Sequence, residues 1–294
     1  MTRRLLIDTD PNVHMRGKDI DDALAILFCI ASPEVKVEGI TVNFGNVKAP
    51  VGFQAARDVL QAAGADIPLL QGAAGPDELG RENEAVKFLI DTVRENPGEM
   101  TLLALAPLTN VATACLLDRG FAANLAGLVI MGGTLDFWIF KYTGEFNLHQ
   151  DAKAAATVIS QSVAKTLITM DVCSQAVFTG EHLARVRSNP SEVCGLCAEF
   201  IEPWLKLNRK IFFRKKGFFP WDVVAASYLV DDTLFEDNPC TLEVVEQGAR
   251  RGRLTGVKRA GGLHAGNGKR PLNLPLKLKG DRFMELFLER LSRL

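Results

Sequence analysis

Four of the five aspartates in residues 8–22 form a group that restricts how the chain can fold. Asp8 and Asp10 come directly after residues 5–7, and Asp21 and Asp22 follow a short loop. Carboxylates this close together must be separated by water, a proton or a cation. A hard divalent ion is the simplest solution, because Ca²⁺ and Mg²⁺ bind carboxylate, carbonyl and water oxygens. The cluster therefore indicates an enzyme with a metal-bound water, in a fold that gathers all four carboxylates at one place.

Apolar segments alternate with segments of helical spacing along most of the chain. The predicted strands are residues 5–7, 37–42, 101–106, 125–131 and 165–170. The predicted helices are residues 23–31, 52–63, 110–117, 152–160, 192–209, 223–229 and 281–294. This alternation predicts an α/β fold with a mostly parallel central sheet, helices on both faces and a Rossmann-like core. We expect a single domain over residues 1–294, with helical insertions at about 75–95 and 179–220 that act as a lid.

Polar residues and glycines lie just past the predicted strands. Ligands in open α/β sheets bind beyond the carboxyl ends of the strands, so these residues should gather on one rim of the sheet. They are Asp8, Asp10, Asn43, residues 107–110, residues 131–133 and Asp171.

The composition argues against several classes of partner and location. The net charge of −1 provides no field that favours nucleic acid or a membrane surface. The sequence begins without the apolar segment of a signal peptide, and it has no apolar run of roughly 18 residues that could span a bilayer. Six cysteines in a chain of this length are not a disulfide framework, and Cys194 and Cys197 form a lone CxxC pair with a structural role. We expect a cytoplasmic protein that binds a small molecule.

Short motifs along the whole chain resemble those of the inosine-uridine preferring nucleoside hydrolases. In the family's order they are Ile7–Pro11, Asp21–Ala25, Gly39–Val42, Gly45–Val47, Asn96–Glu99, Leu105–Asn110, Met131–Gly133, Glu145–Asn147 and Trp221–Ala225. The resemblance implies the nucleoside hydrolase fold and a role in nucleoside salvage and purine metabolism. The implied reaction is Ca²⁺-dependent hydrolysis of the N-glycosidic bond of a ribonucleoside to free base and ribose, with the logic of an inverting glycosidase. It also implies a homodimer or homotetramer.

The resemblance implies a set of metal ligands. Asp10 would bind Ca²⁺ and act as the general base on water. Asp22, Asp222 and the main-chain carbonyl of Thr109 would complete the protein ligands. The ion would lower the pKa of the water and orient the ribose hydroxyls.

The resemblance also implies the contacts to the substrate. Asp21 and Asn147 would hold the 2′- and 3′-hydroxyls of the ribose, and Glu145 would contact the sugar nearby. Asp8 would steady the metal ligands from behind. Asn43, at a strand end, is either a contact to the base or a turn-forming residue.

Trp221 departs from the pattern of many family members, which have a histidine that assists the leaving base directly before the last metal aspartate. A purine-preferring branch resembles this chain in having a tryptophan there that stacks on the base. A core or rim tryptophan is the alternative. If Trp221 stacks on the base, protonation of the leaving group must come from elsewhere or from solvent.

A second departure is an insertion. The family usually places three residues between the acid that corresponds to Asp10 and the following Asp-Asp pair, whereas ten stand here, residues 11–20. Asn12, His14 and Arg16 are candidates to reach the substrate, and a surface loop is the alternative. His149, close to the expected sugar contacts, is a candidate acid for the leaving base or a structural residue.

Two further departures concern the identity of the substrate. The asparagine that the family uses at the ribose 5′-hydroxyl is missing between Gly133 and Glu145, and so is the usual His-Gly segment before residue 83. A basic run could receive a 5′-phosphate, which would make the protein a nucleotide N-ribohydrolase, although a solvated helix face is the alternative. A non-catalytic protein that binds ribosyl ligands is a third possibility. The basic run is Lys206, Arg209, Lys210, Arg214, Lys215 and Lys216.

Overall fold

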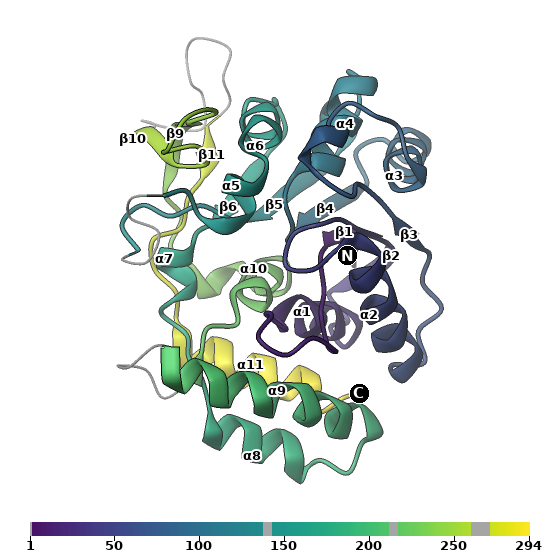
Figure 1. The fold of residues 1–294 in the computed structure, drawn as a ribbon, viewed down its shortest axis with the longest axis vertical. Coiled ribbons are helices and arrows are strands. Elements are labelled where there is room, and N and C mark those ends of the chain that lie inside the picture. The colour runs from purple at the N-terminus through teal and green to yellow at the C-terminus, as the bar shows by residue number, and fades with distance from the viewer. Residues whose placement is uncertain (1, 138–142, 212–216, 260–270) are drawn as a thin grey trace.

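A twisted, mostly parallel sheet forms the centre of the molecule (Figure 1). The computed structural model describes residues 2–137, 143–211, 217–259 and 271–294, without the side chains of residues 209–211. Within these residues the sheet has nine strands in the order β10-β9-β11-β6-β5-β4-β1-β2-β3, and β7 and β8 form a separate pair. The strands are β1 Arg3–Thr9, β2 Val35–Val42, β3 Leu69–Gln71, β4 Met100–Ala104, β5 Gly127–Met131, β6 Lys165–Ile168, β7 Phe178–Thr179, β8 Gly217–Phe218, β9 Pro239–Val244, β10 Leu254–Arg259 and β11 Leu272–Asn273.

Six neighbouring strands, in the order β3-β2-β1-β4-β5-β6, are all parallel. This is the strand order of a Rossmann-like sheet, and it confirms the predicted α/β class. The sequence did not predict β3, β9, β10 or β11. These strands lie near or at the two edges of the sheet, and they are short or partly exposed, so their apolar pattern is weak.

Two hydrophobic layers cover the two faces of the sheet, because successive side chains of a strand point to opposite faces. In β1, Leu5 and Ile7 belong to one layer, and Leu6 belongs to the other. The first layer is completed by α1 Asp21–Ile30, α2 Ala49–Ala62, α10 Trp221–Val230 and α11 Gly280–Leu291. The second is completed by α3 Glu84–Glu95, α4 Thr109–Leu117 and α6 Ala152–Ile159.

The two predicted insertions have different places in the fold. Residues 75–95 form a 3₁₀ turn and α3, and α3 packs on α4 and β3 as part of a sheet-covering layer. Residues 179–220 include α8 Gly180–Ser188 and α9 Glu192–Ile211, which pack against each other below the sheet in the view of Figure 1. The cysteines of α9, Cys194 and Cys197, are buried and free, in line with a structural role. No helix in the described ranges is long and apolar enough to cross a bilayer.

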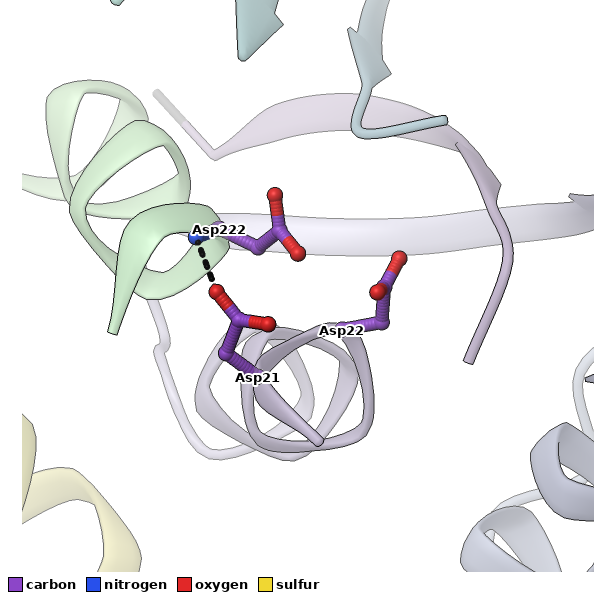
Figure 2. A group of neighbouring side chains, drawn as sticks. All are labelled: Asp21, Asp22 and Asp222. Carbon is purple, nitrogen blue, oxygen red and sulfur yellow. Dashed lines mark hydrogen bonds between the residues drawn. The ribbon is translucent and has the colours of Figure 1, made fainter. Parts of the chain in front are cut away.

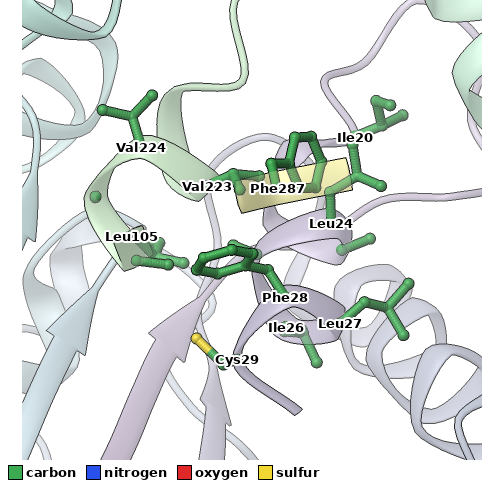
Figure 3. Packing of buried hydrophobic residues seen from close by; sticks show 14 of the residues in the cluster. Ile20, Leu24, Ile26, Leu27, Phe28, Cys29, Leu105, Val223, Val224 and Phe287 are labelled. Carbon is green, nitrogen blue, oxygen red and sulfur yellow. The ribbon is translucent and has the colours of Figure 1, made fainter. Parts of the chain in front are cut away.

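The side chain of Phe28 anchors α1 in the core, and α1 is the helix that carries Asp21 and Asp22. Phe28 is completely buried, and its ring meets that of Phe287 edge-on, with the ring centroids 6.1 Å apart (Figure 3). Ala, Leu and Ile residues fill the rest of the helix between the sheet and α11. The position of the acidic end of α1 therefore depends on this packing.

We predict that Phe28→Ala lowers the free energy of unfolding by about 3–5 kcal/mol, because it leaves a cavity in a closed core. Urea unfolding followed by circular dichroism measures the change. Leu116→Ala is the matched control, since Leu116 is 52% exposed and its truncation should cost about 0.5 kcal/mol or less. Similar losses in the two variants would contradict this account of the core.

Candidate active site

A cavity of about 410 Å³ lies beyond the carboxyl ends of four neighbouring strands. Asp10 follows β1, Leu105 follows β4, Met131 ends β5 and Met170 comes soon after β6, and all four line the cavity. The strand order reverses between β1 and β4, and such a switch point is where open α/β sheets bind their ligands. The rim predicted from the strand ends is therefore present, with the cavity at its centre.

Three further carboxylates reach the cavity from the amino-terminal ends of two helices. Asp21 and Asp22 are in the first turn of α1, and Asp222 is in the first turn of α10. Figure 2 shows the three side chains converging, with the main-chain N–H of Asp222 donating a hydrogen bond of 3.0 Å to Asp21. One carboxylate oxygen of each residue lies within 4.8 Å of the others. The partial positive charge of a helix amino terminus makes this a favourable place for acids.

Asp10 is held next to Asp22 by hydrogen bonds from the main chain. The N–H of Asp10 and the hydroxyl of Thr9 both donate to Oδ1 of Asp22, over 3.1 and 2.5 Å. The N–H of Asn46 donates to Oδ2 of Asp10 over 2.6 Å. A Cβ atom at Gly45 would lie 1.9 Å from that oxygen, so only glycine lets the chain pass this close to Asp10.

These carboxylates are costly to leave charged without a partner cation. Burial is the main reason that the pKa of Asp10, Asp21, Asp22 and Asp222 is raised. Repulsion from neighbouring carboxylates adds to the increase for Asp10, Asp21 and Asp222. Oδ1 of Asp222 is buried without a hydrogen-bond donor in the described chain. A group of oxygen donors with an unsatisfied carboxylate oxygen fits a hard divalent cation.

The structure corrects the expected carbonyl ligand, Thr109. Thr109 is buried at the start of α4, does not line the cavity, and donates its hydroxyl to Asp151 over 2.7 Å. Leu105, four residues earlier, lines the cavity, and its carbonyl oxygen accepts a hydrogen bond of 2.6 Å from Asn147. The difference arises because Leu105 directly follows β4, next to β1, whereas the chain then turns away into α4.

Asn147 and Glu145 both line the cavity on the side of α5, Phe146–Gln150. The carboxylate of Glu145 caps this helix, accepting hydrogen bonds from the N–H groups of Asn147 and Leu148 over 2.9 and 3.1 Å. It also accepts one from the N–H of Gly133 over 2.8 Å. Burial raises the pKa of Glu145, while these three hydrogen bonds lower it. Glu145 therefore fixes the turn that carries Asn147 as well as facing the cavity.

Asp8 and Asn43 lie behind the cavity rather than in its wall. Asp8 is completely buried, accepts hydrogen bonds of 2.6 and 2.8 Å from Thr41 and Asn110, and has a pKa raised to about 6, mainly by burial. Asn43 donates to the carbonyl of Pro107 and accepts from the N–H of Phe44. These contacts join β1, β2 and the segment after β4.

An aromatic wall closes another side of the cavity. The ring of Trp221 lies 4.6 Å from that of Phe219 and 5.6 Å from that of Phe137, between centroids. Trp204 and Asn208, from α9, line the cavity as well. No sequence pattern singles out these two residues, since their spacing of four residues also suits an ordinary helix face.

The other candidates from the sequence point away from the cavity. His14 pairs with Asp58 over 2.7 Å, and His149 contacts the carbonyl of Arg251 over 3.0 Å. Asn12 bonds within its own loop. Three other residues of the same insertion, Gly17, Lys18 and Asp19, do line the cavity.

The basic run offers no anion site among the described residues. Lys206 pairs with Glu202 over 2.9 Å. The side chains of Arg209 and Lys210, and residues 214–216, lie outside the described part of the chain.

Comparison with known proteins shows the family that this chain resembles. The sequence model of the family described as inosine-uridine preferring nucleoside hydrolase matches residues 5–285. The chain is 30% identical to the non-specific ribonucleoside hydrolase RihC of Salmonella schwarzengrund, over 83% of this chain and 84% of that protein. It is 26% identical to uridine nucleosidase 1 of Arabidopsis thaliana, over 99% of this chain and 93% of that protein.

Solved structures show the same fold. A purine-preferring ribonucleoside hydrolase from Gardnerella vaginalis superposes with a TM-score of 0.87, at 23% identity, over 99% of this chain and 98% of that one. A plant nucleoside hydrolase also superposes with a TM-score of 0.87, at 24% identity, over 99% of both chains.

We predict that, in the presence of a metal chelator, the free energy of unfolding of this protein falls as the pH rises from about 4 to 7. In the unfolded chain Asp8 loses its proton near pH 3.8, whereas in the folded chain its pKa is about 6. The folded state therefore binds more protons in this window, and stability is lost as the pH rises through the folded pKa. Asp8 alone accounts for a loss of about 3 kcal/mol in the free energy of unfolding across this pH range.

Urea unfolding in EDTA at several pH values measures this slope. Asp8→Asn should reduce it, and Asp66→Asn, at an exposed position before β3, should leave it unchanged. A wild-type stability that is flat or rises over this range would contradict the prediction.

Proposed function

The chain belongs to the inosine-uridine preferring nucleoside hydrolase family, a group of hydrolases acting on N-glycosyl compounds, and we propose that Asp10 is its general base in a Ca²⁺-dependent site. The reaction is the hydrolysis of a ribonucleoside to free base and ribose. The convergence of Asp10, Asp21, Asp22 and Asp222 at the switch point of the sheet is the observation that carries this proposal.

The proposed Ca²⁺ ligands are Asp10, Asp22, Asp222 and the carbonyl oxygen of Leu105. All four residues line one cavity, and the three carboxylates are buried. Oxygen donors of this kind suit Ca²⁺, which accepts six to eight of them in flexible geometry. When bound, Ca²⁺ supplies a Lewis acid that makes water more acidic and orients hydroxyl groups. Leu105 takes the place of Thr109 in this proposal because only Leu105 borders the cavity.

The chain's own residues position the reactants. Asp10 accepts the proton of the attacking water. The N–H of Asn46 donates a hydrogen bond to Oδ2 of Asp10 and holds the carboxylate in place. Asp21 and Asn147 face the same cavity and hold the 2′- and 3′-hydroxyls of the ribose. Asp8 supports the end of β1, directly before Asp10, through its hydrogen bonds to β2 and α4. Binding the diol beside the carboxylates places C1′ within reach of the water.

The base lies against the aromatic wall. Trp221 provides a flat apolar surface, and Trp204 provides a second indole in the same cavity. Stacking on such surfaces stabilises a purine more than a pyrimidine because a purine has the larger π-system. We therefore propose a purine nucleoside as the preferred substrate.

We also propose a cytoplasmic location and a homo-oligomeric assembly. All six cysteines are buried and free, which fits the reducing conditions of the cytoplasm. A homodimer or homotetramer, implied by the family resemblance, is tested by light scattering of the purified protein.

Asp10→Asn should lower kcat by at least about 10²-fold, because it removes the base and one negative ligand while keeping the size of the side chain. The assay measures release of reducing sugar from purine and pyrimidine nucleosides and their 5′-monophosphates, with Ca²⁺ or EDTA. Asp91→Asn, an exposed substitution on α3, is the control and should be fully active. Near wild-type turnover by Asp10→Asn would rule out Asp10 as the base, and activity unchanged in EDTA would rule out the metal.

Trp221→Ala should reduce kcat/KM for inosine about tenfold more than for uridine. The reason is that stacking on an aromatic ring is worth about 1–3 kcal/mol per base and depends on the area of the base. The same panel of nucleosides measures the ratio. An equal loss for both substrates would show that Trp221 supports the cavity without selecting the base.

A further inference from the structure

The leaving base presents a chemical problem that the residues assigned so far do not solve. When the C1′–N bond breaks, the base receives the electron pair and must be stabilised by a proton or a positive charge. Trp221 cannot supply either, since the indole ring does not carry an ionisable proton at neutral pH. His14 and His149 do not line the cavity. The proton must therefore come from another residue of the cavity or from solvent.

Building on the proposed nucleoside hydrolysis, we propose that Lys18 contacts the departing base and gives it a proton. Among the described residues that line the cavity, Lys18 is the only lysine, arginine or histidine. Trp204, Asn208 and Trp221 line the same cavity. Lys18, Gly17 and Trp204 also border an adjoining groove between the insertion and α9, so Lys18 and Trp204 line both spaces.

The ammonium group of Lys18 is available to a ligand. Lys18 makes no hydrogen bond or ion pair with any residue in the described part of the chain. An ammonium group has three hydrogen-bond donors on a flexible stem, so it can follow the nitrogen of a base as the bond lengthens. A hydrogen bond from a charged donor is about twice as strong as a neutral one. These properties suit a group that stabilises developing negative charge.

The main chain next to Lys18 is tied to the proposed general base. The side-chain amide of Asn46 accepts a hydrogen bond of 3.1 Å from the N–H of Asp19 and donates one of 2.8 Å to its carbonyl. The N–H of Asn46 donates to Asp10 over 2.6 Å. One residue therefore links the position of Lys18 with that of Asp10.

The rest of the insertion is also held in place. The carbonyl oxygen of the Asn12 side chain accepts hydrogen bonds from the N–H groups of His14 and Met15, over 3.3 and 2.8 Å. His14 pairs with Asp58 of α2. Gly17 has a φ of +85°, which lets the chain turn immediately before Lys18. The insertion thus presents Lys18 from a defined loop.

The proposed step balances in atoms and charge. Water attacks C1′ and loses a proton to Asp10, the C1′–N bond breaks, and its electron pair moves to the nitrogen of the base. Lys18 gives its proton to the base and becomes a neutral amine. Transfer of the proton from Asp10 to Lys18 through solvent restores both groups, and the net reaction is nucleoside plus water giving ribose plus neutral base.

Lys18→Met is the test, with two substrates whose leaving groups differ. Inosine needs a proton on its leaving base, whereas 4-nitrophenyl β-D-ribofuranoside releases a phenolate that is stable without one. With saturating Ca²⁺, Lys18→Met should lower kcat for inosine about 100-fold and change kcat for the nitrophenyl riboside less than about threefold. Lys153→Met is the control, because Lys153 is exposed on α6 and borders neither the cavity nor the groove; it should leave both rates unchanged.

The other outcomes are equally informative. An equal loss of kcat for both substrates would overturn the inference, because Lys18 would then act on the ribose or on the loop. Unchanged turnover of inosine would overturn it as well. If the wild-type protein with Ca²⁺ hydrolyses neither substrate, the proposed function itself fails and the inference fails with it. Activity of the wild type on the nitrophenyl riboside shows that the hydrolase site works. A failure of the Lys18 inference can then be distinguished from a failure of the proposed function.

Discussion

Electrostatic repulsion among buried carboxylates is the constraint on which the rest of this structure depends. Asp10, Asp21, Asp22 and Asp222 share one cavity, and burial raises the pKa of each. The fold reduces the cost of burying these charges because β1 ends where α1 and α10 begin. Main-chain N–H groups there donate hydrogen bonds to the carboxylates. A bound cation would remove the remaining repulsion, which connects the stability of the protein with its proposed chemistry.

The same geometry divides the cavity into parts with different tasks. Carboxylates and the carbonyl of Leu105 occupy the end near β1 and β4, where the ribose is proposed to bind. Trp204 and Trp221 line the same cavity, and the base is proposed to stack there. Lys18 also lines this cavity, on an insertion that hydrogen bonds connect to Asp10. Cleavage of a glycosidic bond needs a base on one side and stabilisation of the leaving group on the other, and the proposed arrangement supplies both.

The sequence was least informative where a residue's role depends on the direction in which its side chain or main chain points, rather than on its place in the sequence. Thr109 and Leu105 stand in one motif, yet only Leu105 borders the cavity, since the chain turns into α4 after it. His14 is in the insertion with Lys18, but its ring contacts Asp58 on the outer side. Residues 75–95 read as a lid, whereas α3 packs on α4 and β3 because its apolar face matches the second hydrophobic layer.

The sequence by itself determined the α/β class, the strand ends that form the rim and the acids of the site, because alternating apolar patterns and clustered charges are local properties. Tertiary structure alone decided which groups share the cavity: Leu105, Trp204, Asn208 and Lys18 join it through the order of strands and the packing of α9. Such proximity arises between segments far apart in the chain, and no local pattern encodes the direction in which each side chain points.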